Sequence, residues 1–225
     1  METDLLLARH GEAHCNLRRV AGGEIGCTGL TERGRDQARQ LGRRLRRMHD
    51  DQPFDAVYVS SRRRARETAE LATGGLGVPV TVEPALAGPQ HGVADGRPWT
   101  EIWAAFGASP GDEPDRPFAE GAESWNQYLA RAMAALGEII ERHPEQRVLV
   151  VAHAETVEAA HTRFLRLPSR PGVGFAVAHC SITWWSHRAP EFGAARWQLV
   201  KHNSTRHLDQ IESARLTPAA RESGP

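Results

Sequence analysis

Hydrophobic residues along the chain form short runs separated by segments with helical spacing. Two runs, Leu5–Ala8 and Arg147–Ala152, are almost continuously apolar. Continuous apolar runs are typical of central strands that are covered on both faces. Further segments with strand character are Phe54–Val59, Val78–Val82, Ser181–Ser186 and Ala195–Val200.

Helical periodicity fills the intervals between these strands. After Thr31, apolar residues recur at helical spacing and arginines fill the outer face; the apolar positions are Ala38, Leu41, Leu45 and Met48. A second helix is expected to begin after Ser124, a favoured N-cap residue, and to stop before Pro144. The alternation predicts an α/β fold, a three-layer α/β/α sandwich around a mainly parallel sheet.

One region interrupts this rhythm. Residues 85–121 are rich in glycine and proline, with a short helix expected around Trp99–Phe106. We interpret this region as a lid-like insertion, since long irregular segments in compact domains often cover binding sites. The chain is therefore expected to form a single domain over residues 1–208, followed by a flexible tail at 209–225.

Composition excludes several function classes. The formal net charge of the 225 residues is zero, so no global field favours nucleic acid or an anionic membrane. Because no signal peptide or membrane-length apolar run is present, we expect a cytoplasmic protein. The three cysteines are scattered, and neither a metal site nor a cofactor is predicted. Of the 28 basic residues, 27 are arginines, which favours a GC-rich bacterial genome.

Chemistry-bearing residues follow the two apolar strands. Leu5–Ala8 runs into Arg9-His10-Gly11, and Arg147–Ala152 runs into His153. Ligands of open parallel sheets bind beyond the carboxyl ends of the strands, so both histidines are expected to face one crevice. A single histidine at a strand end is usually structural, but two such histidines, one beside an arginine, favour a functional site.

A group of arginines forms a third cluster. The segment VYVSSRRRARETAE leads from a strand into a helix, with Arg62, Arg63, Arg64 and Arg66 at the junction. A helix N-terminus with several guanidinium groups favours anion binding. A solvated basic face is the alternative interpretation.

Taken together, these segments resemble the histidine phosphatase superfamily, also called the phosphoglycerate mutase-like family. LLLARHGEAHCN resembles its R-H-G-E/Q-x-x-x-N signature, and CTGLTERGRDQARQLGRRL its L-T-x-x-G-x-x-Q-A segment. VYVSSRRRARETAE is similar to S-x-x-x-R-A-x-x-T-A, which places the second arginine of the family at Arg64. EGAES, VLVVAHAETVEAA and NSTRHL extend the resemblance from about Leu5 to Leu208.

The resemblance implies a phosphatase that works without a metal. His10 would be the nucleophile and would carry the phosphoryl group as phosphohistidine. Arg9, Arg64 and His153 would hold the phosphoryl oxygens, and Asn16 would contribute a further donor.

This chain departs from the family at the proton donor. Most members of the phosphoglycerate mutase branch have a glutamate where LAGPQHGVADG has Gly88. Glu155, two residues beyond His153, is our first choice for the acid, because multiple inositol polyphosphate phosphatases have a similar H-A-E sequence. His91 or Asp95 in the insertion are alternatives. A structural role for Glu155, as a first-turn glutamate favoured by the helix dipole, is the remaining interpretation.

The expected substrate is a small phosphorylated metabolite. His14, Arg62 and His91 are expected in the pocket wall, and Arg62, at a usually apolar position of the family, could bind a second anionic group. Trp99 and Trp103 either form an apolar wall or pack the insertion onto the domain. A phosphohistidine or phosphoprotein phosphatase and a weakly catalytic phosphate-binding regulatory module are the alternative functions. The sequence also allows a homodimer.

Overall fold

The computed structural model describes residues 2–107, 113–169 and 172–209. In this part of the chain, one six-stranded sheet has the order β3-β2-β4-β1-β5-β6. The strands are β1 Thr3–Arg9, β2 Ala56–Ser60, β3 Val80–Glu83, β4 Arg147–Ala152, β5 Ile182–Arg188 and β6 Arg196–Ser204. Strands β1 to β4 pair in parallel, whereas β5 and β6 add an antiparallel edge.

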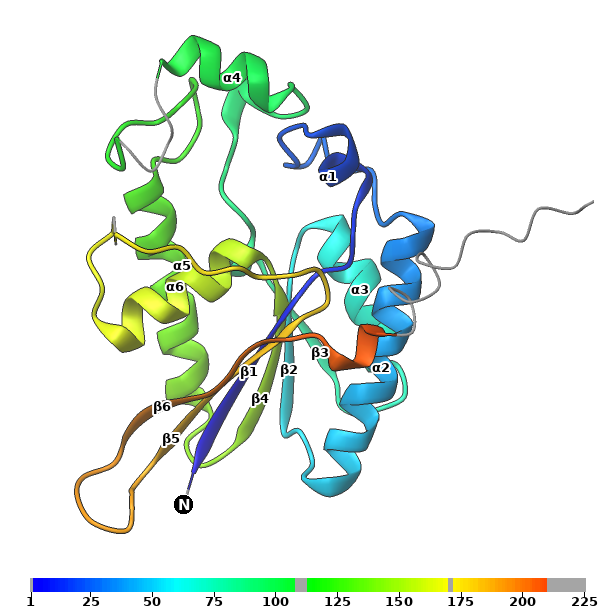
Figure 1. The fold of residues 1–225 in the computed structure, drawn as a ribbon, viewed down its shortest axis with the longest axis vertical. Coiled ribbons are helices and arrows are strands. Elements are labelled where there is room, and N and C mark those ends of the chain that lie inside the picture. Colours follow the sequence, from blue (N-terminus) through cyan, green and yellow to red (C-terminus); the bar gives the residue numbers. More distant parts are fainter. Residues whose placement is uncertain (1, 108–112, 170–171, 210–225) are drawn as a thin grey trace, which may run out of the picture.

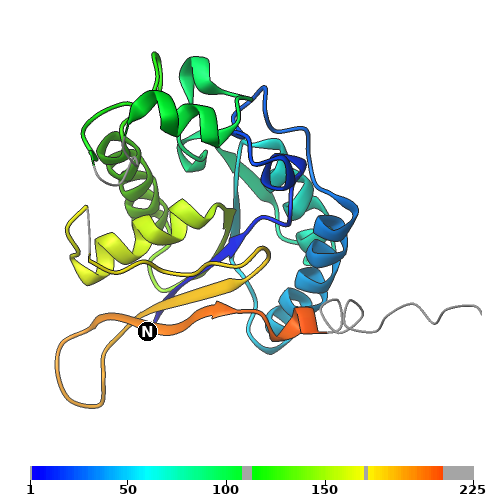
Figure 2. The same ribbon diagram turned by 45° about the horizontal axis from the view of Figure 1, so that its top comes forward.

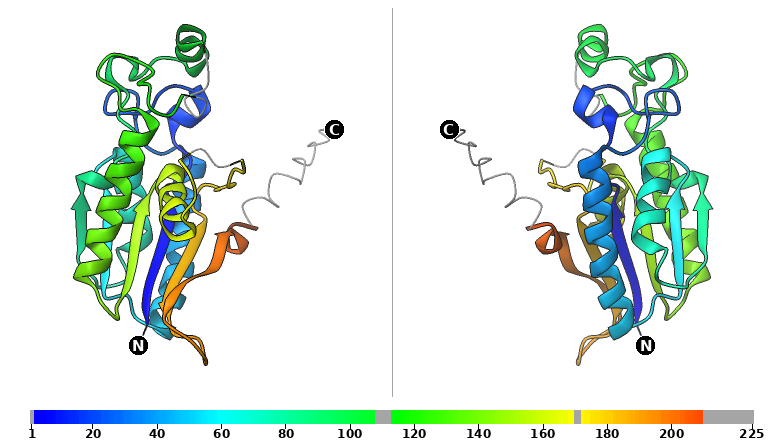
Figure 3. Two further views of the ribbon diagram at one scale, coloured as in Figure 1. Left: turned by 90° about the vertical axis from the view of Figure 1, so that its left-hand side faces the viewer. Right: turned by 90° about the vertical axis from the view of Figure 1, so that its right-hand side faces the viewer.

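The helices form layers on both faces of this sheet (Figure 1; Figure 3). They are α1 His14–Arg18, α2 Glu32–Asp51, α3 Arg63–Thr73, α4 Trp99–Phe106, α5 Trp125–Arg142 and α6 Ala154–Leu165, with 3₁₀ turns η1 Pro84–Leu86, η2 Gly92–Ala94 and η3 Arg206–Leu208. The α/β sandwich predicted from the sequence is confirmed, and the helix expected over Trp99–Phe106 occurs with those bounds.

Alternating side chains of the central strands supply both core layers. On β1, Leu6 and Ala8 pack with α2 and α3, whereas Leu5 and Leu7 pack with α5 and α6. All four are at most 1% exposed. This two-sided burial explains why β1 and β4 are continuous apolar runs rather than alternating ones.

Local capping fixes where the long helices begin. The Thr31 hydroxyl accepts a hydrogen bond from the Gly34 N–H at the start of α2. Ser124 does the same for Gln127 at the start of α5, and the Gln127 side chain returns a bond to the Ser124 N–H. This capping box confirms the expected N-cap. The short helix α1 was not predicted, because five residues carry too little periodicity to be recognised.

The insertion lies beyond the carboxyl ends of the parallel strands, beside the segment that follows α1 (Figure 2). The Asp95 carboxylate accepts hydrogen bonds from the backbone N–H groups of Gly23, Ile25 and Gly26. Backbone bonds from Ala21 to Arg97 and from Gly96 to Ala21 add to this attachment. Residues of the insertion are therefore tied directly to the loop after α1.

Three further expectations concern the remaining chain. Trp99 packs against His91 and Phe118 in a small cluster, which favours the packing role for this tryptophan over a free wall. Apart from Asp209, the predicted tail at 209–225 lies outside the described residues. No described helix combines the length and apolarity needed to cross a bilayer.

The contact between α2 and the segment that follows β1 requires glycine at position 34. A methyl group on Gly34 would lie 1.9 Å from the Glu12 carbonyl oxygen, a backbone atom that cannot rotate away. We predict that Gly34→Ala lowers the free energy of unfolding by about 2 kcal/mol or more, because overpacking shifts the backbone. Urea denaturation would measure this, with Gly75→Ala as control, since its methyl group would meet no atom closer than 3.6 Å. Equal stability of the two variants would contradict the prediction.

Candidate active site

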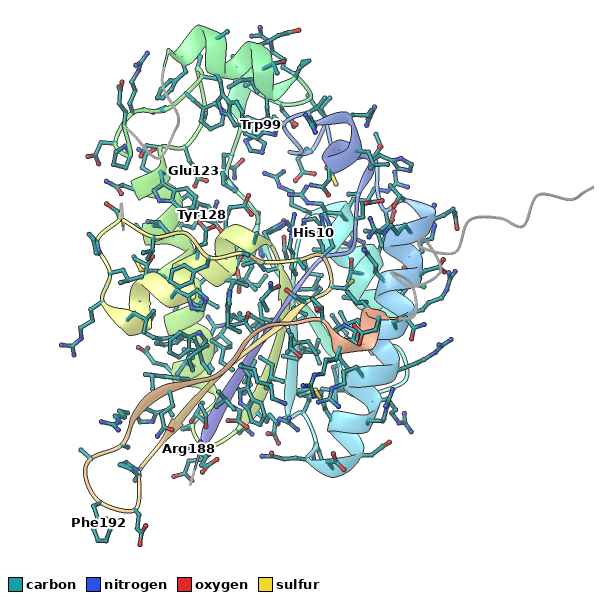
Figure 4. The ribbon with its side chains drawn as sticks, viewed as in Figure 1. His10, Trp99, Glu123, Tyr128, Arg188 and Phe192 are labelled. Atoms are coloured by element: carbon teal, nitrogen blue, oxygen red, sulfur yellow. The ribbon has the colours of Figure 1, made fainter. Side chains whose placement is uncertain are left out.

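The parallel register of β1 and β4 brings the two strand-end histidines together. Arg9 stands opposite Ala152, so the next residues, His10 and His153, emerge side by side. Their ring centroids are 5.3 Å apart, and the side chains are 3% and 0% exposed. His10 lies at the centre of the molecule, below α1 and the insertion (Figure 4).

Hydrogen bonds define the tautomer of His10. Its Nδ1 lies 2.7 Å from the Gly11 carbonyl oxygen, which can only accept, so Nδ1 carries the proton. Nε2 lies 3.0 Å from Nε of Arg64, which can only donate. Nε2 therefore has the lone pair, which points toward a guanidinium group. A nucleophile that attacks the phosphorus of a bound phosphate needs such a lone pair.

Electrostatics keep His10 neutral. Burial lowers the pKa of His10 well below its ordinary value, and the nearby charges of Arg64 and Arg9 lower it further. The pKa of His153 is also lowered well below normal, by burial first and then by Arg64 and Arg62. Both imidazoles are therefore in the neutral form at neutral pH, and Nε2 of His10 retains its lone pair.

Arg64 links the two histidines. It is 7% exposed in the first turn of α3, and its Nη2 donates to Nδ1 of His153 at 3.2 Å. Its Nη1 donates to the Gly22 carbonyl oxygen. On the other side of His153, Nε2 donates to the Ser60 hydroxyl at 2.7 Å. A phosphoryl group at His10 Nε2 would thus have an arginine fork within hydrogen-bond reach.

Arg9 adds a second guanidinium to this centre. Its Nη1 donates to the Val177 carbonyl, while its buried Nε has no partner among the described residues. Burial lowers the pKa of Arg9, and the charge of Glu155 acts in the opposite direction. The structure therefore places Glu155, partly buried at the start of α6, within electrostatic reach of Arg9.

Gly88, the position at which the family resemblance led us to look for a glutamate, directly borders the centre. A Cβ at this position would lie 3.4 Å from Nη2 of Arg64 and 3.5 Å from Cγ of His153. These are ordinary contact distances, so a side chain here would enter the site. Arg131 holds the segment in place by donating to the carbonyls of Ala85 and Ala87.

The two alternative proton donors from the insertion fit that role poorly. Burial would raise the pKa of Asp95, but its three backbone N–H donors outweigh burial and hold the pKa below normal. Asp95 is thus an ionised anchor. Burial and the charge of Arg62 lower the pKa of His91 to about 4, so this imidazole holds no spare proton at neutral pH.

Of the residues expected in the pocket, some lie beside the histidine pair and others do not. Arg62 is buried beside the centre, and its backbone N–H donates to the Ser60 hydroxyl. His91 is 8% exposed and feels the charges of Arg62 and Glu155. The Asn16 side chain accepts from the Ala13 N–H and so caps α1. His14 is exposed on α1, without a side-chain contact to this centre in the described chain.

Two residues near the centre were missed by sequence reasoning. The ring of His179 lies 5.6 Å from that of His10, and its buried Nε2 has no partner in the described residues. Glu158, one turn beyond Glu155 on α6, has a pKa raised to about 7 by burial and by Glu155. His179 precedes β5 in an irregular segment without periodicity, whereas the spacing of Glu155 and Glu158 on one helix face was a usable signal.

The fold agrees with the comparisons to known proteins. The family model of the histidine phosphatase superfamily (branch 1) matches residues 5–205, and the chain belongs to this superfamily. Groups of three or more metal-ligating side chains are absent from the described residues.

Two curated proteins and one solved structure are similar to this chain over most of its length. The metal-independent phosphoserine phosphatase of Arabidopsis thaliana is 31% identical over 74% of this chain and 71% of its own length. The probable phosphoglycerate mutase GpmB of Erwinia tasmaniensis is 27% identical over 90% and 94%. The structure of a mycobacterial glucosyl-3-phosphoglycerate phosphatase with VO3 is 27% identical, covers 90% of this chain and 99% of its own, and has a TM-score of 0.74.

The raised pKa of Glu158 predicts a pH-dependent stability. Between its ordinary pKa of 4.5 and about 7, the folded protein keeps a proton that the unfolded chain has lost. Stability is therefore lost as the pH rises through this window. Glu158→Gln removes the ionisation and should stabilise the protein at pH 8 relative to pH 5, by at most about 3 kcal/mol.

Urea denaturation at both pH values measures this difference. Glu141→Gln, at an exposed position of α5, is the control and should show no such pH dependence. If Glu158→Gln had the same effect at pH 5 and pH 8, the assigned ionisation would be wrong.

Proposed function

We propose that this protein is a phosphatase that hydrolyses a small phosphomonoester through a phosphohistidine on His10. The observation that carries the proposal is the unprotonated Nε2 of His10, held 3.0 Å from the guanidinium of Arg64 and beside a second buried histidine. The superfamily membership and the phosphatases among the relatives support the same reaction class.

The first step transfers the phosphoryl group to the protein. The lone pair of His10 Nε2 forms a bond to phosphorus while the bond from phosphorus to the leaving oxygen breaks. Arg64 and Arg9 bind the nonbridging oxygens and stabilise the charge that develops on them. The Nδ1–H bond to the Gly11 carbonyl stabilises the cationic ring of the intermediate.

Glu155 supplies the proton to the leaving oxygen in this proposal. Glu155 is partly buried at the start of α6, directly after His153, and its charge acts on both Arg9 and His91, which supports this role. In the second step, water attacks phosphorus, the carboxylate of Glu155 takes up a proton from that water, and the bond between nitrogen and phosphorus breaks. Inorganic phosphate leaves, and His10 recovers its lone pair.

A small substrate is favoured over a phosphoprotein. Backbone and Asp95 hydrogen bonds attach the insertion to the loop after α1. This attachment restricts the approach of a folded partner. Two of the similar proteins described above are named as phosphatases of small phosphorylated compounds, phosphoserine and glucosyl-3-phosphoglycerate.

The first test is phosphate release in metal-free buffer. p-Nitrophenyl phosphate and a panel of sugar, inositol and nucleotide phosphates would be compared with a phosphohistidine peptide. We expect turnover of small compounds that falls at least 1,000-fold, as an order of magnitude, in His10→Ala, because the nucleophile is lost. His187→Ala, near the amino end of β1, is the control and should keep full activity.

Absence of turnover on every compound, in a folded protein that still binds phosphate, would favour the regulatory binding module. Turnover of the phosphohistidine peptide alone would favour the phosphoprotein alternative.

The role of Glu155 has its own test. Glu155→Gln should slow hydrolysis of glycerol 3-phosphate by roughly 100-fold or more, because the alkoxide leaving group needs a proton. Hydrolysis of p-nitrophenyl phosphate should fall only a few-fold, since its leaving group is already stable. Steady-state kinetics on both substrates would be measured. Equal losses on the two compounds, or no loss on either, would refute the assignment.

A further inference from the structure

Arg62 is a buried cation that the proposed reaction does not use. It is the N-cap residue of α3, and its side chain is only 3% exposed. Its backbone N–H donates to the Ser60 hydroxyl, which also binds the ring of His153. Arg62 is therefore anchored directly beside the phosphoryl-binding centre. Within the described part of the chain, it makes no hydrogen bond to His10 or to Arg64.

The ion pair of Arg62 neutralises it incompletely. Its Nη1 lies 2.6 Å from Oε1 of Glu24, which belongs to the loop after α1 and is 75% exposed. Its Nε is buried without a partner in the described chain. A buried guanidinium needs a well-satisfied set of acceptors to offset its desolvation. Arg62 lacks such a set, because one of its acceptors is the solvent-exposed Glu24 and its Nε–H has no acceptor in the described chain.

His91 has a second unsatisfied polar atom close to this cation. The side chain is 8% exposed, and its Nδ1 has no partner among the described residues. Among the charges that act on His91, that of Arg62 is the strongest. The charge of Arg62 also acts on His153. The charge of Arg62 therefore acts both on His153 of the centre and on His91 of the insertion.

From these contacts we propose that Arg62 and His91 form a subsite for a second anionic group of the substrate. The proposal rests on the phosphatase function above and names its substrate class, a phosphomonoester with a further carboxylate or phosphate. Arg9 and Arg64 suffice for the phosphoryl dianion, so Arg62 remains available for another anion. The unused Nε–H of Arg62 and the Nδ1 of His91 would donate to that anion, and Glu24 would yield its place on the guanidinium.

Matched substrate pairs test this subsite. 3-Phosphoglycerate and glycerol 3-phosphate differ only in a carboxylate against a hydroxymethyl group. Fructose 1,6-bisphosphate and fructose 6-phosphate differ in a second phosphate. We expect at least one pair to show a tenfold or greater preference in kcat/KM for the compound with the second anion, mainly through KM, and that pair identifies the anion. Equal values within both pairs would overturn the proposal.

Arginine variants then show which residue causes the preference for the second anion. Arg62→Met should reduce the ratio within the preferred pair to near one, and Arg62→Lys should retain part of it. Using the ratio cancels any general loss of activity or of folded protein. Arg63→Met is the matched control, because Arg63 is the neighbouring arginine with an exposed side chain that pairs with Glu67. Loss of the preference in Arg63→Met but not in Arg62→Met would refute the assignment.

Glu24→Gln gives an opposite and more specific expectation. If Glu24 competes for Arg62, its neutralisation should lower KM for the substrate with the second anion and raise the ratio further. A purely structural ion pair would give no such gain. Should no compound be hydrolysed, the proposed function fails, and calorimetric titration of the same pairs still decides whether Arg62 selects for a second anion.

Discussion

The parallel pairing of β1 with β4 is the constraint on which the whole centre depends. The register that places Arg9 opposite Ala152 also fixes His10 beside His153. Both strands are buried on both faces, so neither can slide without moving its side chains into the wrong core layer. The two histidines are thus positioned by the buried central strands of the fold. The arginines approach from α3 and from the strand end, which are packed on the same core.

Much of this arrangement could be predicted from the sequence. Continuous apolar runs located β1 and β4, and the residues that follow each run supplied both histidines. The apolar spacing after Thr31 and the Ser124 cap located the two long helices. What periodicity could not supply was the contribution of irregular segments. His179 reaches His10 from a segment without regular spacing, and the Asp95 carboxylate binds a loop some seventy residues earlier in the chain.

Gly88 determines how the insertion approaches the centre. Gly88 borders Arg64 and His153 at contact distance, so the insertion approaches the centre through backbone rather than through a carboxylate. Two glutamates of α6, Glu155 and Glu158, lie one turn apart on the helix that follows His153, and the charge of Glu155 acts on Arg9. Groups on a packed helix hold their geometry better than groups on a loop. The insertion then contributes packing residues such as Trp99 and the imidazole of His91.

The bond between Arg64 and His10 has a consequence for the resting protein. Because the guanidinium donates to Nε2, the reactive nitrogen is capped whenever the crevice holds no anion. A neutral electrophile that diffuses in would meet a lone pair already engaged. In the proposed reaction, the oxygens of an incoming phosphoryl group would take over the Arg64 donor and so release Nε2 of His10 for attack. The substrate itself would then expose the nucleophile, and no lid would have to move to protect it.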